Sequence, residues 1–388
     1  MNDQYYDSVN NKIQKKNEIN FEENIKILKR IKENIKDSEK ILNVVVNEKT
    51  NTVVYLIGTI HVSQQSCEDI KTMLSIIEPD TIFLELSNER ESLLTATDNQ
   101  IISQLLKKPK INWFTTSLSD FYLSIHQNFY YYTTKISMSN KFLINYDKSQ
   151  NQNQNQNNDS NNIKPYIYGN EFRVGYQYSK ENKCSILLGD RNFKSTWNRI
   201  FNYLDLPTIL GLGGLGIKSF LKFYNQSIEE IREQYYKSVN EMIDASWDSD
   251  IWRRDLPEAF QRGLINERDQ YMASCIRDAP HSKKMVAIVG KGHIKGISQN
   301  LNDTTEGFYI RSDLEGFQVP TLLSKFSYPI LVPSLLLLPP TLSVYSFHRL
   351  IKPLSKQKFS LALLSTLSIE LLSINYLISN FEKKLEKL

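Results

Sequence analysis

The chain has 388 residues, enough for one large domain or two smaller ones with a substantial core. Its net charge of +4 comes from residues 349–388, where seven basic side chains face three acidic ones, so the rest is neutral and a nucleic-acid surface is not expected. The three cysteines are scattered singly, which argues against a zinc knuckle or a disulfide framework and suits a reducing compartment.

Residues 1–40 form a polar, highly charged N-terminal extension. It contains no apolar core of a secretory signal, and its acidic residues do not match an Arg-rich mitochondrial presequence. Ile25, Leu28 and Ile31 recur at helical spacing among lysines and glutamates, which predicts a solvated amphipathic helix. We therefore expect the main domain to face the cytosol.

Two β-rich runs, Ile41 to Val46 and Asn51 to Ile57, flank a short polar turn and predict a β-hairpin. Ser63 can cap a helix that runs to about Ile77, and a further strand is expected over Thr81 to Leu86. We expect this strand to lie parallel and adjacent to the second hairpin strand, through a right-handed crossover.

Glu85 lies within this apolar strand, where a carboxylate is costly without a charged or metal partner. A structural explanation is a pair with Arg90, or with a backbone group near the surface. The functional explanation is a metal ligand or a general base at the end of the strand.

The middle of the chain offers less chemistry. Residues 99–143 are aromatic-rich and are expected to be helical; without an interleaved basic pattern the rings indicate packing. Residues 147–162 are a low-complexity Asn/Gln insertion, expected to be a disordered surface loop within one domain. Gly211 to Gly216 formally contains G-x-G-x-x-G, but no strand precedes it, so we expect a loop.

Three later segments of the chain carry polar residues at or near predicted helices and strands. Gly169-Asn170-Glu171-Phe172 opens a predicted helix, and the predicted strand Cys184 to Leu188 leads into Gly189-Asp190-Arg191, where Asp190 can equally cap a helix. Residues 255–279 predict a helix that carries Glu267-Arg268-Asp269, a run that usually indicates a solvated charged face. Phe308 to Ile310 are expected to form a last short strand.

The same pattern ends two distant strands: Gly58-x-x-His61 and Gly290-x-x-His293. Ligands of open α/β sheets bind at the carboxyl edge, so we expect His61, Glu85, Asp190, Arg191 and His293 to gather there. Imidazoles with a carboxylate are common ligands of a divalent transition metal, whose bound water Glu85 can deprotonate. A purely structural role for each histidine is the alternative.

The C-terminal region differs in kind. Residues 326–347 contain no charge and residues 359–381 only Glu370, and each run is about long enough to span a bilayer. Four prolines interrupt the first run, so it can bend or be re-entrant, and basic residues flank the second as interfacial anchors do. We expect a membrane-anchor region over residues 325–388; a buried helical hairpin of a soluble protein is the alternative.

Together these motifs resemble the TraB family, which includes bacterial pheromone-shutdown proteins and eukaryotic TraB domain-containing proteins and is related to the Tiki membrane proteases. The resemblance covers about residues 41–312. It rests on the two G-x-x-H motifs and on the segments Glu85 to Arg90, Gly169 to Phe172, Gly189 to Arg191 and Glu267 to Asp269.

The resemblance implies an α/β domain over residues 41–320, with a mixed, largely parallel sheet and flanking helices, followed by a C-terminal hydrophobic helical hairpin. Carried over from the Tiki branch, it implies manganese or cobalt held by His61, His293 and Glu85. In our own hypothesis Glu85 is a ligand or the base, and Arg90, Arg191 or Arg268 stabilises an oxyanion or holds a substrate carboxylate. The supporting residues are Glu171, Asp190, Glu267, Arg268 and Asp269.

We therefore predict a membrane-anchored, metal-dependent hydrolase of the peptidase kind, with membrane contact through residues 326–381 and a peptide or protein substrate. Similarity to eukaryotic members implies the outer mitochondrial membrane. The alternative is a non-catalytic organiser, adaptor or peptide-binding regulator at that membrane.

Overall fold

A computed structural model of the chain describes residues 21–61, 63–98, 100–101, 169–205, 226–253, 256–303 and 305–316, together with Thr208, Tyr376 and Lys383. The chain divides into two compact units. The first comprises residues 1–107, 137–203 and 236–318, and the second comprises residues 108–136, 204–235 and 319–388. The sheet and every predicted site residue belong to the first unit.

The first unit is built on a five-stranded sheet with the order β1-β2-β5-β3-β4. β1 pairs with β2 antiparallel, and the other three neighbouring pairs are parallel. The predicted mixed, largely parallel sheet is therefore confirmed. The strands are β1 (Leu42–Asn47), β2 (Thr52–Thr59), β3 (Thr81–Leu84), β4 (Ser185–Leu188) and β5 (Lys284–Gly290).

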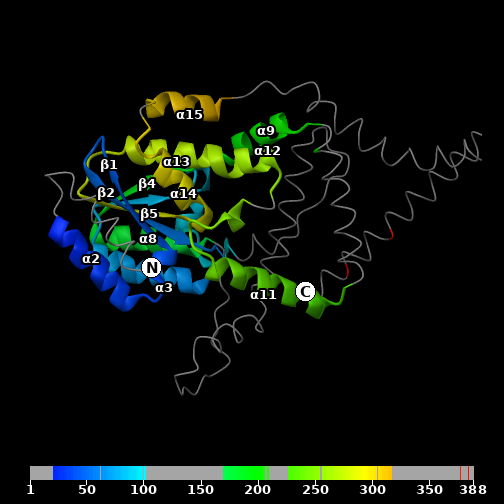
Figure 1. Cartoon of the computed structure of the whole chain (residues 1–388), viewed down its shortest axis with the longest axis horizontal. Helices are drawn as coiled ribbons and strands as arrows, with labels where there is room; N and C mark the ends of the chain where they lie inside the picture. Colours follow the sequence, from blue (N-terminus) through cyan, green and yellow to red (C-terminus); the bar gives the residue numbers. More distant parts are fainter. Residues whose placement is uncertain are drawn as a thin grey trace, which may run out of the picture. The chain divides into compact units, whose positions relative to one another are not determined.

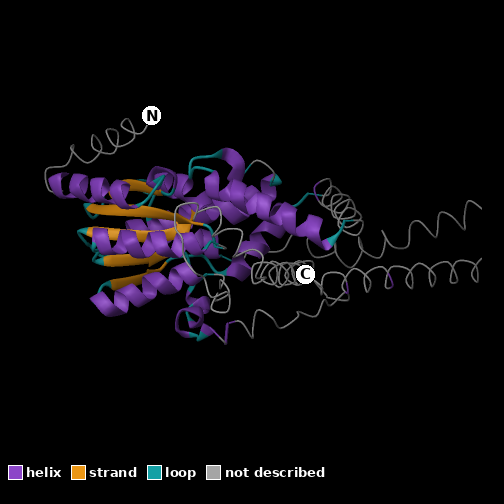
Figure 2. Ribbon diagram, turned by 90° about the horizontal axis from the view of Figure 1, so that it is seen from below, coloured by secondary structure: helices purple, strands orange, loops and turns teal. Residues whose placement is uncertain are grey.

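Helices cover both faces of this sheet (Figures 1 and 2). The α-helices in the described part of the chain are α2 (Phe21–Asn34), α3 (Gln64–Ile77), α4 (Ser92–Thr95), α8 (Asn170–Asn182), α9 (Phe193–Tyr203), α11 (Ile228–Asp244), α12 (Glu258–Phe260), α13 (Glu267–Arg277), α14 (Ile294–Asn300) and α15 (Gly307–Glu315). A π-helical segment, η4 (Gln261–Asn266), joins α12 to α13. Short 3-10 turns are η1 (Ser38–Lys40), η2 (Asn88–Arg90), η3 (Asp250–Trp252) and η5 (Lys291–His293).

Two apolar cores lie on opposite faces of the sheet. Successive strand residues point to opposite sides, so Tyr55 packs with α2, α3 and α8, while Leu56 packs with α13 and α14. The predicted amphipathic helix is α2, and it buries Leu28 and Ile31 in the first core. β2 and β5 are buried on both faces, which explains why their sequences are continuous apolar runs.

The position of β5 corrects one expectation. β2 and β3 are not adjacent, because β5 lies between them and pairs with both in parallel. The physical reason is burial: β5 is apolar on both faces and needs two neighbours, whereas the partly exposed β4 takes the edge.

Local signals were mostly confirmed. The predicted hairpin is β1 and β2, and the side chain of Ser63 accepts a hydrogen bond from Ser66 N at the start of α3. β3 ends at Leu84, two residues earlier than predicted. Residues 307–315 form helix α15 instead of the strand predicted over residues 308–310, because the amides of Tyr309 and Ile310 both bond to Glu306 O in a first helical turn.

The predicted helix over residues 255–279 consists of α12, η4 and α13. Its charged run is not a solvated face, since Glu267 and Asp269 are 5% and 1% exposed. That prediction was wrong because each carboxylate meets basic side chains from distant segments, as described below.

Several predicted features lie outside the described residues. They include the aromatic segment beyond residue 101, the Asn/Gln insertion, the glycine-rich stretch 211–216 and, apart from Tyr376, the two apolar runs. The domain boundaries placed there stay predictions. Among the helices of the described part, none combines the length and the apolar character that crossing a bilayer requires.

Gly189 offers a test of how tightly the sheet edge is packed. A Cβ at this position would come within 1.9 Å of Cε2 of Phe83, which is fully buried. We predict that Gly189→Ala lowers the free energy of unfolding by about 2 kcal/mol, because the ring cannot move aside. Urea unfolding of the purified variant measures this change.

The matched control is a double-mutant cycle with Phe83→Leu, which removes the ring. In that background Gly189→Ala is expected to cost less than about 1 kcal/mol. An equal cost in both backgrounds would show that the ring is not the obstacle.

Candidate functional site

The carboxyl ends of β2, β3 and β5 bring together side chains that are far apart in the sequence. A Cβ placed on Gly290 would lie 3.2 Å from Nε2 of His61, 3.3 Å from Oε2 of Glu85 and 3.5 Å from Cδ2 of His293. The guanidinium of Arg268 contacts both Glu85 and His293. We call His61, Glu85, Arg268 and His293 the strand-edge cluster.

The strand register creates this arrangement. Thr59 pairs with Gly290, and Leu84 pairs with Ile288, so the residues that follow these strands emerge side by side. At Gly58 a Cβ would lie 2.7 Å from Cδ1 of Ile294 and 3.0 Å from Cα of Lys291. Glycine at the end of β2 therefore lets the turn after β5 close over it.

Glu85 is a buried carboxylate with several partners. One oxygen bonds to Arg268 and lies 3.3 Å from Nε2 of His293, and the other accepts the Gly290 N–H at 2.5 Å. Burial raises the pKa of Glu85, but the charges of His293, Arg268 and His61 and the Gly290 N–H outweigh it, so the pKa lies well below its usual value. The carboxylate is therefore charged at neutral pH.

Arg268 is the centre of the cluster. Its Nε and Nη2 bind the two oxygens of Asp190 at 2.9 and 3.0 Å, and its Nη1 lies 3.1 Å from Nε2 of His293. Burial lowers the pKa of Arg268, but Asp190 and Glu85 raise it above its usual value. Asp190 thus holds an arginine and does not cap α9, because Asn192 accepts the bonds from the first amides of that helix.

His61 is oriented by a carboxylate. Its Nδ1–H donates to Glu171, a fully buried residue in the first turn of α8, and the Phe172 ring lies 5.6 Å away. This bond directs Nε2 toward Gly290. Burial lowers the pKa of His61, but the charge and hydrogen bond of Glu171 raise it more, so the net pKa is above 6.5.

His293 is oriented in the same way by a different carboxylate. Its Nδ1–H donates to Asp269 at 2.6 Å, and Arg253 binds the other Asp269 oxygen at 3.0 Å. A Cβ at Gly296 would lie 1.8 Å from that oxygen, so only glycine leaves room for this carboxylate. Each imidazole therefore has its ring fixed at Nδ1.

Arg191 and Glu267 form a second network, separate from the cluster. The buried Arg191 donates to Glu267 at 2.8 Å and to Gly263 O at 2.8 Å, and Glu267 also binds Arg199 and Tyr203. Residues that are neighbours in the sequence therefore belong to different networks. Asp190 binds Arg268 of the cluster, whereas Arg191 and Glu267 bind each other. Arg90, in η2, has no hydrogen bond or ion pair to the cluster within the described part of the chain.

Sequence reasoning named Arg268 as one of three candidate arginines but did not pair it with Glu85, and it missed Arg253. No local pattern pairs position 268 with position 85, which lies 183 residues away. The available signal was the run Glu267-Arg268-Asp269, whose alternating charges point in different directions on a helix and so require several partners.

A divalent metal ion requires several His, Cys, Asp or Glu ligands around one point. Among the described residues, no three His, Cys, Asp or Glu side chains are close enough to one point to hold a metal ion. Glu85 Oε1 and His293 Nε2 both face Arg268, and His293 turns Cδ2 toward Gly290. The residue types suit a metal, but with a guanidinium among them this arrangement does not fit one. Manganese or cobalt binding stays a prediction.

Acidic groups outnumber arginines among the described side chains at the cluster. Four carboxylates, from Glu85, Glu171, Asp190 and Asp269, meet two guanidinium groups, from Arg253 and Arg268. Protonation of either imidazole adds positive charge beside these carboxylates.

The second network predicts how stability depends on pH. Burial raises the pKa of Glu267, but bonds from Arg199, Arg191 and Tyr203 lower it from 4.5 to about 2. A carboxylate with a lowered pKa stabilises the fold above pH 4.5 and loses this effect as the pH falls toward 2. Glu267→Gln should therefore cost on the order of 3 kcal/mol at pH 7, and about 2 kcal/mol less at pH 3.

Denaturant unfolding of both proteins at the two pH values tests this. The exposed Glu258 supplies the control, and Glu258→Gln is expected to change stability by less than about 0.5 kcal/mol at either pH. A cost for Glu267→Gln that does not vary with pH would contradict the assignment.

Comparison with known proteins gives two findings. A protein of Methanocaldococcus jannaschii described as uncharacterised is 24% identical over 257 residues, which cover 66% of this chain and 54% of that protein. This chain thus spans about half of the relative's length. The family model described as TraB/PrgY/gumN family matches residues 42–309, which contain β1 to β5 and the whole strand-edge cluster. The resemblance in the motifs is thereby confirmed, and the chain belongs to the TraB/PrgY/gumN family.

Proposed function

We propose that this chain is a hydrolase of amide or ester bonds that acts at the strand-edge cluster. The observation that carries the proposal is the pair of imidazoles, each held at Nδ1 by a buried carboxylate, on either side of a buried Glu85–Arg268 pair. Such oriented imidazoles at the carboxyl edge of a largely parallel sheet are suited to proton transfer.

His61 is the general base in this proposal. The Glu171 carboxylate keeps the proton on Nδ1, so Nε2 is the atom that can take a proton from water, and the carboxylate stabilises the imidazolium that forms. The His61 side chain is 26% exposed, whereas that of His293 is 11% exposed. His61 is therefore the imidazole better placed to meet water and substrate.

Arg268 supplies positive charge for the oxyanion. Of the three arginines considered for that role, it is the one that the described structure places in the cluster. Glu85 and Asp190 hold its guanidinium in a largely buried position, where a fixed charge stabilises developing negative charge more strongly than in water. His293 lies beside it, and its Nε2 accepts a hydrogen bond from Nη1 of Arg268, which helps to fix the guanidinium.

A metal-dependent form of the same hydrolase is the second candidate. It is favoured by the two Nδ1–carboxylate pairs, because metal-binding histidines usually carry such partners. It would require Arg268 to leave Glu85, so that His61, His293 and Glu85 could hold the ion. The metal would then supply an acidified water.

The sequence alone supports the further proposals on location and partners. These are a membrane anchor through residues 326–381, a main domain that faces the cytosol at the outer mitochondrial membrane, and a peptide or protein substrate. The rival is a non-catalytic organiser or peptide-binding regulator, in which the cluster is a structural network. Activity measurements separate these two.

Loss of the base should remove activity. We predict that His61→Ala lowers kcat/KM by about 10² to 10⁴ on a library of fluorogenic peptide amides and esters. Glu171→Gln should lower it by about tenfold or more, because the ring loses its fixed tautomer. His281→Ala is the matched control, since His281 is exposed and its Nδ1 bonds to Thr50 O in the turn between β1 and β2.

Circular dichroism would verify that each variant is folded. Wild-type rates in folded His61→Ala would refute the assignment of the base. Failure of the wild-type chain to cleave any member of the library would favour the regulator.

Metal removal separates the two forms of the hydrolase. We expect the EDTA-dialysed chain to contain substoichiometric metal and to keep its activity, because Arg268 supplies the positive charge. Elemental analysis and rates before and after addition of manganese or cobalt provide the measurement. The control is His61→Ala/His293→Ala, which should bind no more metal than wild type.

The opposite result would establish the metal-dependent form. In that case manganese or cobalt binds stoichiometrically, activity returns only with the metal, and the double variant loses binding. Arg268→Met would then bind the metal more tightly than wild type, because the competing cation is gone.

A further inference from the structure

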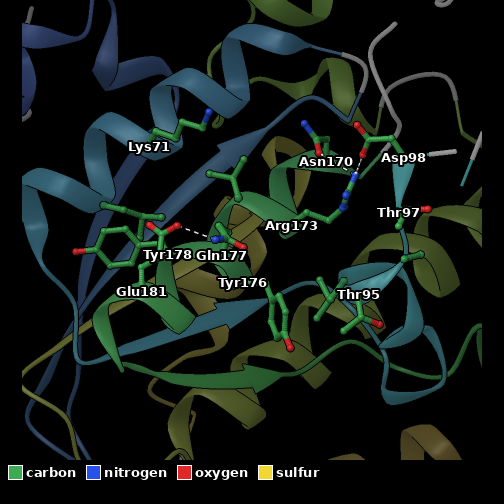
Figure 3. Close-up of a pocket in the computed structure, with 14 residues that line it drawn as sticks. Lys71, Thr95, Thr97, Asp98, Asn170, Arg173, Tyr176, Gln177, Tyr178 and Glu181 are labelled. Carbon is green, nitrogen blue, oxygen red and sulfur yellow. Dashed lines mark hydrogen bonds and ion pairs between the residues drawn. The ribbon is translucent and has the colours of Figure 1, made fainter. Parts of the chain in front are cut away.

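A pocket lies along α8, and the buried Glu171 at the start of that helix does not line it. It has a volume of about 840 Å³ and is lined by residues of α3, α4, α8 and the segment that follows α4 (Figure 3). The proposed chemistry does not use this pocket. Its residues all belong to the first unit and none of them is in the strand-edge cluster.

The lining combines aliphatic side chains with polar ones, some of which are uncharged amides. Leu74, Leu94 and Val174 supply aliphatic surface, while Asn170 and Gln177 supply side-chain amides. Side-chain amides can both donate to and accept from a peptide backbone. Such a lining suits an extended peptide, whose backbone can bond to the amides while alternate side chains contact the aliphatic surface.

Charges in the pocket are balanced. Two basic residues, Lys71 and Arg173, face two acidic ones, Asp98 and Glu181. Arg173 donates to Asp98 at 2.6 Å, as Figure 3 shows, and Gln177 donates to Glu181 at 2.6 Å. A phosphate-rich ligand or a nucleic acid would need an excess of positive charge, which this lining lacks.

The length and position of the pocket are informative. Its lining runs along α8 from Asn170 to Glu181, a distance of about 17 Å at 1.5 Å per helical residue. An extended peptide covers that distance with about five residues. Asn170 is the residue before Glu171, which orients His61, so one end of the pocket begins where the general base is held.

We propose that this pocket binds an extended polypeptide segment of about five residues, on one side of the bond that is hydrolysed at the strand-edge cluster. This assignment rests on the proposed function and specifies its substrate. Backbone amides of the substrate bond to Asn170 and Gln177, and alternate side chains rest on Leu74 and Val174.

Two exposed positions on α4 give a matched pair of variants. Thr95 lines the pocket and Ser92, three residues earlier on the same helix, does not. Thr95→Trp fills the pocket with an indole, whereas Ser92→Trp adds the same ring outside it. Because both side chains are exposed, neither change disturbs the core.

Binding is measured without turnover, in full-length His61→Ala protein, by fluorescence anisotropy of fluorescein-labelled random hexapeptides. Thr95→Trp is expected to weaken binding at least tenfold, and Ser92→Trp to leave it within twofold. A second pair on α8, Gln177→Trp and Asn182→Trp, should behave in the same way, since Gln177 lines the pocket and Asn182 does not.

Equal binding by both members of each pair, or no hexapeptide binding at all, would overturn the pocket assignment. Hydrolysis of a fluorogenic single-residue amide, which is too short to reach the pocket, is followed in parallel with His61 intact. If this hydrolysis persists while both pairs bind alike, the hydrolase stands and the pocket assignment falls. Selective loss of binding without any hydrolysis would support the pocket and refute the proposed hydrolase.

Discussion

The buried guanidinium of Arg268 is the interaction on which the site depends. It joins α13 to Glu85 at the end of β3 and to Asp190 just beyond β4. Removing such charges from water costs several kcal/mol for each ion, and that cost is recovered only when geometry and hydrogen bonding are nearly complete. Here both Asp190 oxygens and one Glu85 oxygen bind the guanidinium, and the second Glu85 oxygen takes the Gly290 amide. The triad therefore positions three strand ends at once.

His61 and His293 are each held at Nδ1 by a carboxylate, but the two carboxylates come from different helix layers. Glu171 reaches His61 from the helix layer on one face of the sheet, and Asp269 reaches His293 from the layer on the other face. Each carboxylate is nearly inaccessible to water, so each fixes its ring strongly. The His61 side chain is the more exposed of the two, at 26% against 11% for His293.

Much of the fold could be predicted from local patterns. The hairpin, the Ser63 cap and the apolar runs that end in glycine depend on neighbouring residues and on burial, and the structure contains all of them. The order of the strands could not be predicted in the same way, because β5 pairs with β2 and with β3, and each pairing joins residues more than 200 positions apart. The exposed strand expected at residues 308–310 failed because three apolar residues fit one helical turn equally well.

The site shows the same division between local and long-range information. His61, Glu85, Asp190 and His293 could be predicted to meet, because each follows a strand and parallel strands end at a common edge. Their partners could not be predicted, since the bonds from His61 to Glu171 and from Arg268 to Glu85 span 110 and 183 residues. Nor could the sequence separate Arg191 from Asp190, because only the folded chain shows that these neighbours turn to different networks.

The central position of β5 affects how the domain folds during its synthesis on the ribosome. Of the five strands in the described part of the chain β5 is synthesised last, yet it is the strand that joins β2 to β3. Until residue 290 has emerged, the nascent chain presents two unpaired strand edges, both apolar on their faces. The domain therefore completes its folding late in translation, and its N-terminal half must be protected from aggregation until the final strand arrives.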